Sequence, residues 1–198
     1  MANNMNYMKL EQTLRDRRMR LFSPLELQRL LGISPVAARF LVHRYAKRGG
    51  LLKLRNGLYS FAGESPSELA IANRLYEPSY VSFEYALAYY HVIPETTYAI
   101  TSATTRPTRT LTAAGRTFEY HRLKRSAFTG YEPARIGGDT VLIALPEKAL
   151  ADYLYFVDLK KKRLNDRLSL RALRWRRIES CVRLFDRPSL LKLARGLR

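Results

Sequence analysis

The chain has 198 residues, and its 35 Lys and Arg against 17 Asp and Glu give a formal net charge of +18. Its hydrophobic fraction of 46% and charged fraction of 26% exclude wholesale disorder, and no apolar run approaches the roughly 18–20 residues of a membrane span. Cys181 is the only cysteine, so an internal disulfide and a Cys-based zinc cage are excluded. Residues 1–7 lack a basic region followed by an apolar core, so we expect that they are not a secretory signal. We expect a cytoplasmic protein without a membrane partner, whose charge favours a polyanion such as nucleic acid.

The charge is divided unevenly along the chain. Residues 1–63 carry 12 Lys and Arg against 3 Asp and Glu, a net charge of +9, whereas residues 64–159 carry −2 and residues 160–198 carry +11. Two basic ends therefore flank a nearly neutral middle. This division predicts a basic first domain at 1–63 and a second domain at 64–198 that ends in a basic tail at 160–198.

The first domain is expected to begin with two helices. A helix from about Asn4 to Arg17 is predicted by apolar residues at Met5, Met8 and Leu14. A second helix follows Ser23-Pro24-Leu25-Glu26, which reads as a capping box with proline at the first helical position, and Gly32 ends it. The buried stripe of this second helix is expected at Leu25, Leu27, Leu30 and Leu31.

A third helix and a hairpin complete the first domain. Ser34-Pro35 starts the helix, which runs to about Arg48 and ends at Gly49-Gly50. Asn56-Gly57 then separates two short apolar runs, as in a hairpin with a type I′ turn, in which both turn residues have positive φ. Helices two and three with their short turn form a helix-turn-helix, and the hairpin makes it a winged helix. The sequence allows two alternative buried faces, or phases, for the third helix. One consists of Val36, Phe40, Leu41 and Tyr45, and the other of Ala38, Leu41, Val42 and Tyr45.

The third helix is the predicted DNA-reading element. Under either phase Arg39 and His43 face away from the core, and the Arg39 guanidinium can pair with guanine O6 and N7. Ser34 caps the helix and can also offer a group to a phosphate. The remaining contacts, mostly to the DNA backbone or the minor groove, are assigned to Arg44, Lys47, Arg48, Lys53, Arg55 and Asn56. The alternative for each of these side chains is a solvated surface position.

The middle of the chain is expected to be α+β. Ser65-Pro66-Ser67-Glu68 predicts a helix of about ten residues, and further helices are expected after Ser82 and from Pro146. Between them, a small and largely antiparallel sheet is predicted, with strands at 97–103, 109–112, 116–123 and 140–144. Tyr85, Tyr89 and Tyr90 have the spacing of a core or interface face, although they could also stack on bases.

No catalytic constellation is visible, so no enzymatic activity, cofactor or metal is expected. His43, His91 and His121 lack metal-ligand spacing with each other or with Cys181, and no glycine-rich loop could cradle a phosphate. Glu147 and Asp152 do not share a helix face closely. Lys148 and Asp152 have the i, i+4 spacing of an ion pair, which we favour over an active site.

The tail is predicted to be a second polyanion-binding surface. Lys160-Lys161-Lys162-Arg163 opens it, and Arg167, Arg171 and Arg174 have the spacing of one side of a helix. An apolar side would dock that helix, at Leu170, Leu173, Ile178, Cys181, Val182 and Phe185. We expect contacts to phosphates rather than to bases. The alternative is a solvated basic helix without a binding role.

The chain resembles the AbiEi family of bacterial antitoxins over nearly its whole length. In the first domain the resemblance rests on residues 30–34, 48–51 and 55–59, which other winged helices share. Two central blocks carry more specificity: residues 80–87, Tyr-Val-Ser-Phe-Glu-Tyr-Ala-Leu, and residues 145–152, Leu-Pro-Glu-Lys-Ala-Leu-Ala-Asp. The second is similar to the family's Pro-Glu-(Arg/Lys)-Ala-Leu-x-Asp block. Residues 1–20 are a longer lead than is usual in the family, and they form either a core helix or a basic arm.

The resemblance implies the antitoxin of a toxin–antitoxin system for phage defence. Its winged helix would repress its own operon by binding double-stranded operator DNA with inverted repeats. Its second domain would counter a nucleotidyltransferase-like toxin, by direct contact or functionally. Two other functions fit the residues: a stand-alone transcription regulator whose second domain senses a ligand or partner, and an RNA-binding or nuclease-like enzyme, which the lack of an acidic or histidine cluster disfavours.

Overall fold

The computed structural model of this α+β protein describes residues 7–64 and 66–198. The chain divides into two compact units, Met1–Ser67 and Glu68–Arg198. Within the described residues there are eight α-helices, a three-stranded antiparallel sheet and a six-stranded mixed sheet. None of these helices combines the length and the apolar character that crossing a bilayer requires.

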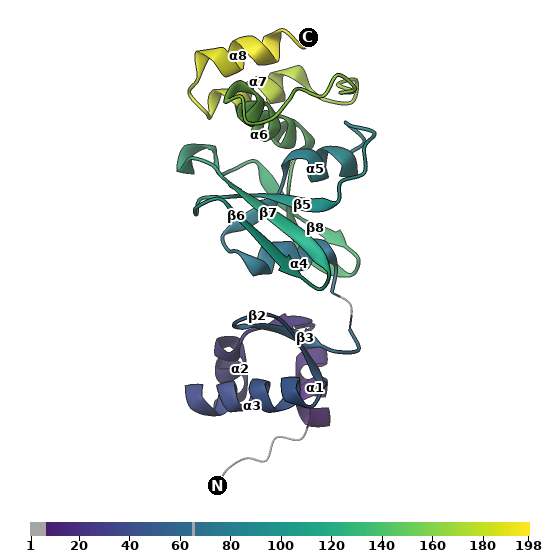
Figure 1. Cartoon of the computed structure of the whole chain (residues 1–198), viewed down its shortest axis with the longest axis vertical. Helices are drawn as coiled ribbons and strands as arrows, with labels where there is room; N and C mark the ends of the chain where they lie inside the picture. The colour runs from purple at the N-terminus through teal and green to yellow at the C-terminus, as the bar shows by residue number, and fades with distance from the viewer. Residues whose placement is uncertain (1–6, 65) are drawn as a thin grey trace. The chain divides into compact units, whose positions relative to one another are not determined.

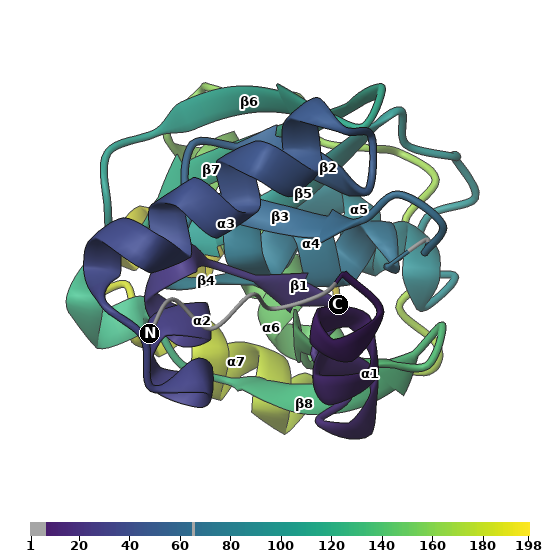
Figure 2. The same cartoon turned by 90° about the horizontal axis from the view of Figure 1, so that it is seen from below.

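The first unit packs three helices against its small sheet. In chain order its elements are α1 (Tyr7–Asp16), β1 (Leu21–Phe22), α2 (Pro24–Leu31), α3 (Pro35–Lys47), β2 (Leu51–Arg55) and β3 (Leu58–Phe61). The strand order is β1-β3-β2. Figure 1 shows α3 on the opposite side of this unit from β2, and Figure 2 looks onto α3 with the strands behind it.

Local sequence signals place α2 and α3 where they were expected. The Ser23 hydroxyl accepts a hydrogen bond from the Glu26 backbone N–H at 3.2 Å, and the Glu26 carboxylate accepts one from the Ser23 backbone at 2.7 Å, so the capping box is confirmed. Gly32 ends α2 in the left-handed conformation, with φ 63°. The Ser34 hydroxyl then caps α3 by accepting from the Ala37 N–H at 3.1 Å.

The core of the first unit settles the open choice of phase in α3. Its buried residues are Ala38, Leu41, Val42 and Tyr45, which leaves Val36 and Phe40 exposed. Two expected positions are wrong, because Leu25 and Met8 are exposed. Leu27 is buried as expected, with Leu30 and Leu31 partly buried beside it, and in α1 Leu10 is buried together with Leu14. The reason is that α1 docks Leu10 and Leu14 into the same core that Leu27 enters. The Tyr7–Asp16 segment of the long lead is therefore a core helix rather than a basic arm; the predicted apolar position at Met5 lies outside the described residues.

The hairpin between β2 and β3 forms with a different turn from the one expected. Gly57 has φ 82°, but Asn56 does not share a positive φ, as a type I′ turn would require. The register shifts between Lys53 and Arg55 instead. A bulge in β2 and one left-handed glycine thus replace the two left-handed turn residues.

The second unit surrounds a mixed sheet with helices. Its order is β6-β7-β5-β4-β9-β8, with β5–β7 and β4–β9 parallel and the other neighbours antiparallel. Figure 1 shows α4 on one face and α5 and α6 on the other, while α7 and α8 pack on α6. The bounds are α4 Glu68–Leu75, β4 Ser79–Val81, α5 Phe83–Tyr89, β5 Ala99–Thr104, β6 Arg109–Ala113, β7 Arg116–Arg122, β8 Tyr131–Ile136, β9 Asp139–Ala144, α6 Pro146–Asp158, α7 Trp175–Arg183 and α8 Pro188–Arg195.

Several expectations for the second unit need correction. The sheet is mixed rather than largely antiparallel, because β5 pairs parallel with β7, and the short central strand β4, which was not expected, pairs parallel with β9. Strand β8 was also missed; Pro133 lies within it, which an edge strand tolerates. Helix α4 begins at Glu68, so Pro66 precedes it, and the predicted cap at Ser65 lies outside the described residues.

Candidate nucleic-acid interface

The exposed face of α3 gathers cations and two apolar side chains. Arg39 and His43, predicted to face away from the core, are exposed, as are Arg44, Lys47 and Arg48 farther along. Phe40 is 69% exposed and Val36 is 53% exposed. Val36, Arg39, Phe40 and His43 line a shallow hollow of about 320 Å³. The predicted reading residues of the helix thus share one surface.

The start of α3 positions its first cation. Arg39 donates from Nε to the Pro35 carbonyl oxygen at 3.3 Å, one helical turn earlier, which leaves the terminal nitrogens of the guanidinium free of this bond. Ser34 is exposed and its hydroxyl is occupied by the helix cap. Arg44 lies over the ring of the buried Tyr45, with 5.1 Å from the guanidinium carbon to the ring centroid. The helix therefore presents Arg39 near its N-terminus and further cations towards its C-terminus.

The hairpin carries the other predicted contacts of the first unit. Lys53, Arg55 and Asn56 are all exposed in or beside the β2–β3 turn. The Arg55 guanidinium donates to the Asn56 carbonyl at 3.1 Å, which holds that side chain against the turn. Arg55 is thus held beside the turn, and the hairpin could present both the turn and this side chain to a nucleic acid.

None of the four acids within residues 7–64 belongs to α3 or to the hairpin. Residues 32–63 contain six Lys and Arg and no Asp or Glu. Glu11 and Glu64 both pair with Arg15, and Glu64 also lies 3.5 Å from Arg20, so these acids offset cations elsewhere in the unit. The cations of α3 have no ion-pair partner within residues 7–64, so their charge is available to an external anion.

The basic tail forms only the second half of the predicted helix: α7 carries the expected apolar residues Ile178 and Val182, which are buried. Helix α7 begins at Trp175, so Arg167, Arg171 and Arg174 lie in a segment without regular secondary structure. Tertiary bonds override the helical spacing: the Tyr153 hydroxyl accepts from the Asn165 N–H at 2.8 Å and donates to the Arg163 carbonyl at 2.5 Å. The Ser169 N–H also donates to the Val92 carbonyl at 2.8 Å.

The predicted tail cations divide into free and paired groups. Lys162 forms an ion pair with Glu84, and Arg167 lies 3.3 Å from Glu95. The exposed cations of the segment that have no ion-pair partner among the described residues are Lys160, Lys161, Arg163, Arg171 and Arg174. Fewer of the predicted tail cations are therefore free to bind phosphates than the net charge of +11 for residues 160–198 suggests.

A buried polar cluster lies between α6 and the sheet. Lys148 and Asp152 are both 0% exposed and form the expected i, i+4 ion pair. Asp152 Oδ2 also accepts from the Ser82 hydroxyl at 2.7 Å and from the Tyr80 hydroxyl at 3.0 Å. Burial raises the pKa of the Asp152 carboxyl, and the Lys148 ammonium and the two hydroxyl donors oppose that rise. Sequence reasoning found the pair but missed its two partners, because they lie about 70 residues earlier.

Aromatic rings seal this cluster. The Lys148 ammonium lies 5.6 Å from the Tyr80 ring centroid and 5.1 Å from that of Phe185. Tyr131 stacks on Tyr80 with centroids 4.4 Å apart. Burial, and then the charge of Asp152, raise the pKa of Tyr80, so its phenol remains a donor. With every side chain enclosed, the cluster can hold α6 on the sheet, but it offers no access to a substrate.

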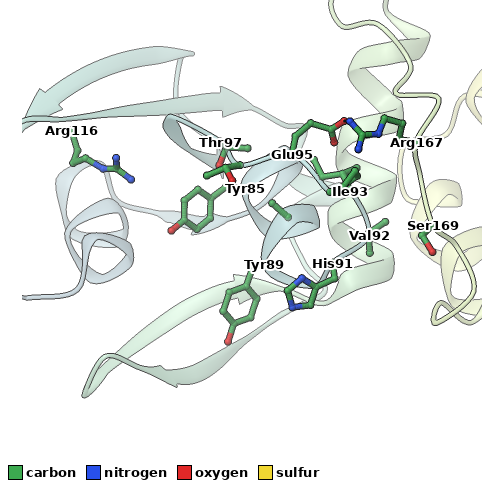
Figure 3. Close-up of a pocket in the computed structure, with 13 residues that line it drawn as sticks. Tyr85, Tyr89, His91, Val92, Ile93, Glu95, Thr97, Arg116, Arg167 and Ser169 are labelled. Carbon is green, nitrogen blue, oxygen red and sulfur yellow. The ribbon is translucent and has the colours of Figure 1, made fainter.

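The second unit also has an open pocket of about 610 Å³ (Figure 3). Tyr85 and Tyr89 project from α5, with Arg116 of β7 at one end and Arg167 at the other. Both arginines have acidic partners, Glu68 at 2.9 Å and Glu95 at 3.3 Å. Burial raises the pKa of the half-buried Tyr85. The pocket therefore combines aromatic faces with charges that are already balanced. It was not expected from the sequence, since its lining comes from three separate segments.

Among the described residues, no three His, Cys, Asp or Glu side chains gather as a metal site would require. Cys181 is half-buried, and burial raises the pKa of its thiol, which makes it a weak nucleophile. Comparison with known proteins finds no matching family model and no matching curated protein.

Proposed function

We propose that this protein is a DNA-binding antitoxin similar to the AbiEi family, and that it represses its own operon without catalysing a reaction. In this proposal α2, α3 and the β2–β3 hairpin act as a winged helix-turn-helix. Helix α3 reads double-stranded operator DNA in the major groove, and the hairpin contacts the backbone. The observation that carries the proposal is the exposed face of α3. Neither this helix nor the hairpin that follows it contains an acidic residue.

The buried cluster supports the part of the proposal that rests on resemblance. Residues 80–87 and 145–152, the two most specific blocks, meet where Tyr80 and Ser82 donate to Asp152. Two motifs distant in sequence thus serve one structural purpose, which is a reason for them to occur together. We assign to this second unit the action against a nucleotidyltransferase-like toxin, and to the free tail cations additional contacts to phosphates.

A gel shift with the DNA upstream of the protein's own gene tests the operator-reading part. Tighter binding to this DNA than to scrambled DNA of equal length is expected, with an affinity that falls steeply with salt because several phosphates are neutralised together. Equal binding to both DNAs would overturn the proposal of a sequence-specific repressor.

Co-expression with the neighbouring gene tests the antitoxin part. Growth arrest by that gene product, relieved by this protein, is expected if the neighbour encodes the nucleotidyltransferase-like toxin. A suitable control is the protein with Arg39→Ala, which should lose repression yet still relieve arrest when expressed from an unrelated promoter. Failure of the unaltered protein to relieve arrest would contradict the assignment.

A second function is favoured by the pocket in Figure 3. A stand-alone regulator would need a place in its second unit for a small ligand, and about 610 Å³ lined by Tyr85 and Tyr89 lies in the size range of such sites. The same gel shift distinguishes the two functions: operator binding that changes with cell-extract metabolites and needs no neighbouring toxin gene would favour the regulator.

A further inference from the structure

The apolar side chains on the face of α3 are out of place for a purely electrostatic contact. Val36 and Phe40 are four residues apart, so they lie one above the other on the helix, and Arg39 and His43 flank them in the same hollow. A phosphate-binding surface needs only cations and hydrogen-bond donors. A phenylalanine that is 69% exposed adds nothing to such a surface and leaves a large apolar ring in water.

The core does not force this exposure. The unit buries the opposite phase, with Ala38, Leu41 and Val42 inside, so the positions of Val36 and Phe40 are free to be polar. Exposed apolar side chains that gather in one patch commonly mark a contact surface. The question is therefore what occupant offers apolar groups to a helix face surrounded by cations.

The charge around the patch favours nucleic acid over a second copy of the chain. Residues 32–63 contain six Lys and Arg and no acid, so two copies meeting through α3 would bring like charges together. The major groove of DNA places phosphates on both sides of a floor of base edges. The one apolar group on those edges is the C5-methyl of thymine, which hydrophobic side chains can contact.

We propose that Val36 and Phe40 read thymine methyl groups in the operator, on either side of the base that Arg39 contacts. This inference rests on the proposed DNA-binding function and names the base chemistry that the same helix recognises. The two side chains are separated by about 6 Å along the helix axis, at about 1.5 Å per residue. Base pairs are about 3.4 Å apart along one strand, so the two methyl groups would belong to thymines about two base pairs apart, with the base that Arg39 contacts between them.

Replacement of thymine by deoxyuridine is the direct test, because it removes the methyl group and leaves every hydrogen-bonding group of the base. The protected operator is first defined with the full-length protein, and each of its thymines is then replaced singly. At one or two positions a loss of about fourfold in affinity is expected, because the burial of one methyl group no longer contributes to binding. Replacements elsewhere in the site should change affinity little.

Variants of the protein assign each methyl group to a side chain. Phe40→Ala should lower affinity for the thymine operator but abolish the difference between thymine and deoxyuridine at one position, and Val36→Ala should do so at another. Met8→Ala is the matched control, since Met8 is an apolar side chain of the same unit that is 73% exposed on α1. It should leave the deoxyuridine effects unchanged. Thermal unfolding of each variant checks that the fold is intact.

The outcomes separate this inference from the function on which it rests. Sequence-specific binding that is equally tight for thymine and deoxyuridine operators would overturn the methyl-reading role and leave the repressor function standing. No preference for the upstream DNA would overturn both. A Phe40→Ala protein that loses a dimer in ultracentrifugation yet keeps its deoxyuridine effects would show that the patch binds protein instead.

Discussion

The two units of this protein place their charged and apolar side chains in opposite ways. The first leaves Phe40 and Val36 in solvent beside unpaired cations, whereas the second encloses Lys148 and Asp152 completely and seals them with aromatic rings. An exposed apolar ring costs stability unless something covers it, and a buried ion pair costs stability unless its geometry is complete. In the function that we propose, the exposed side chains of the first unit serve recognition, whereas we expect the enclosed pair of the second unit to serve the uniqueness of the fold.

The largest effect is expected at the buried cluster. Asp152→Ala leaves the Lys148 ammonium enclosed without its counter-charge, so the free energy of unfolding should fall by about 3–5 kcal/mol. Urea unfolding of the full chain measures this loss. The double variant Lys148→Met, Asp152→Leu should recover most of it, because no uncompensated charge remains. A loss below 1 kcal/mol for Asp152→Ala alone, the range of an exposed pair, would break the contrast between the units.

A smaller effect, on binding rather than folding, is expected on α3. Arg39→Ala should weaken operator binding by about 1–3 kcal/mol and relax specificity at one base pair, while the free energy of unfolding stays nearly unchanged. Arg15→Ala is the matched control, since it removes the same charge from α1, where Glu11 and Glu64 pair with it. Gel shifts with operator and scrambled DNA provide the measurement.

The tail sharpens this second prediction. Replacing Lys160, Lys161 and Arg163 by alanine should weaken binding to operator and scrambled DNA alike and reduce the salt dependence. Lys162 is kept because its ion pair with Glu84 belongs to the fold. If the tail variant lost specificity and Arg39→Ala did not, the assignment of base reading to α3 would be reversed.

The smallest effect is a pH dependence in the second unit. Burial and the nearby Lys162 lower the pKa of His121, against the opposing effect of Glu119 and Glu84. Below the ordinary histidine pKa of about 6.5 the unfolded chain therefore takes up a proton that the folded chain resists. The free energy of unfolding should have its full value above that pH, and it should fall as the pH is lowered towards the pKa of His121 in the folded protein.

His121→Phe should remove this acid sensitivity, because the phenyl ring takes up no proton and can keep the contacts with Phe83 and Phe156. Urea unfolding at pH 7.5 and pH 5.5 measures the difference for both proteins. An equal loss of stability in the two would assign the acid sensitivity to other groups.

Features that depend only on neighbouring residues, such as the ends of helices, could be predicted from the sequence. Ser23 with Glu26, Gly32 and Ser34 fixed the limits of α2 and α3 because a cap needs only neighbouring residues. Signals that depend on distant partners were not readable. The three-residue strand β4 exists because β5 and β9 flank it, and the basic segment after α6 is non-helical because Tyr153 and Val92 bind its backbone.

The candidate sites divide along the same line. The cations of α3 could be named from spacing, since both phases of the helix leave Arg39 and His43 outside. The exposure of Phe40 could not, because only the packing of α1 and the strands decides which phase is buried. The partners of Asp152 and the lining of the pocket were missed for a related reason: each set is assembled from segments that only the folded chain brings together.

The two hydrogen bonds of the Tyr153 hydroxyl have a consequence for how a mutation could alter the basic tail. The phenol holds the backbone of both Arg163 and Asn165, so it sets where the neighbouring positive charges stand without carrying any charge itself. A substitution to phenylalanine would leave the isoelectric point of the chain essentially untouched and still remove two of the bonds that hold that segment. The position of the positive charges in the tail thus depends in part on an uncharged residue of the core, and a mutation there can move those charges without changing their number.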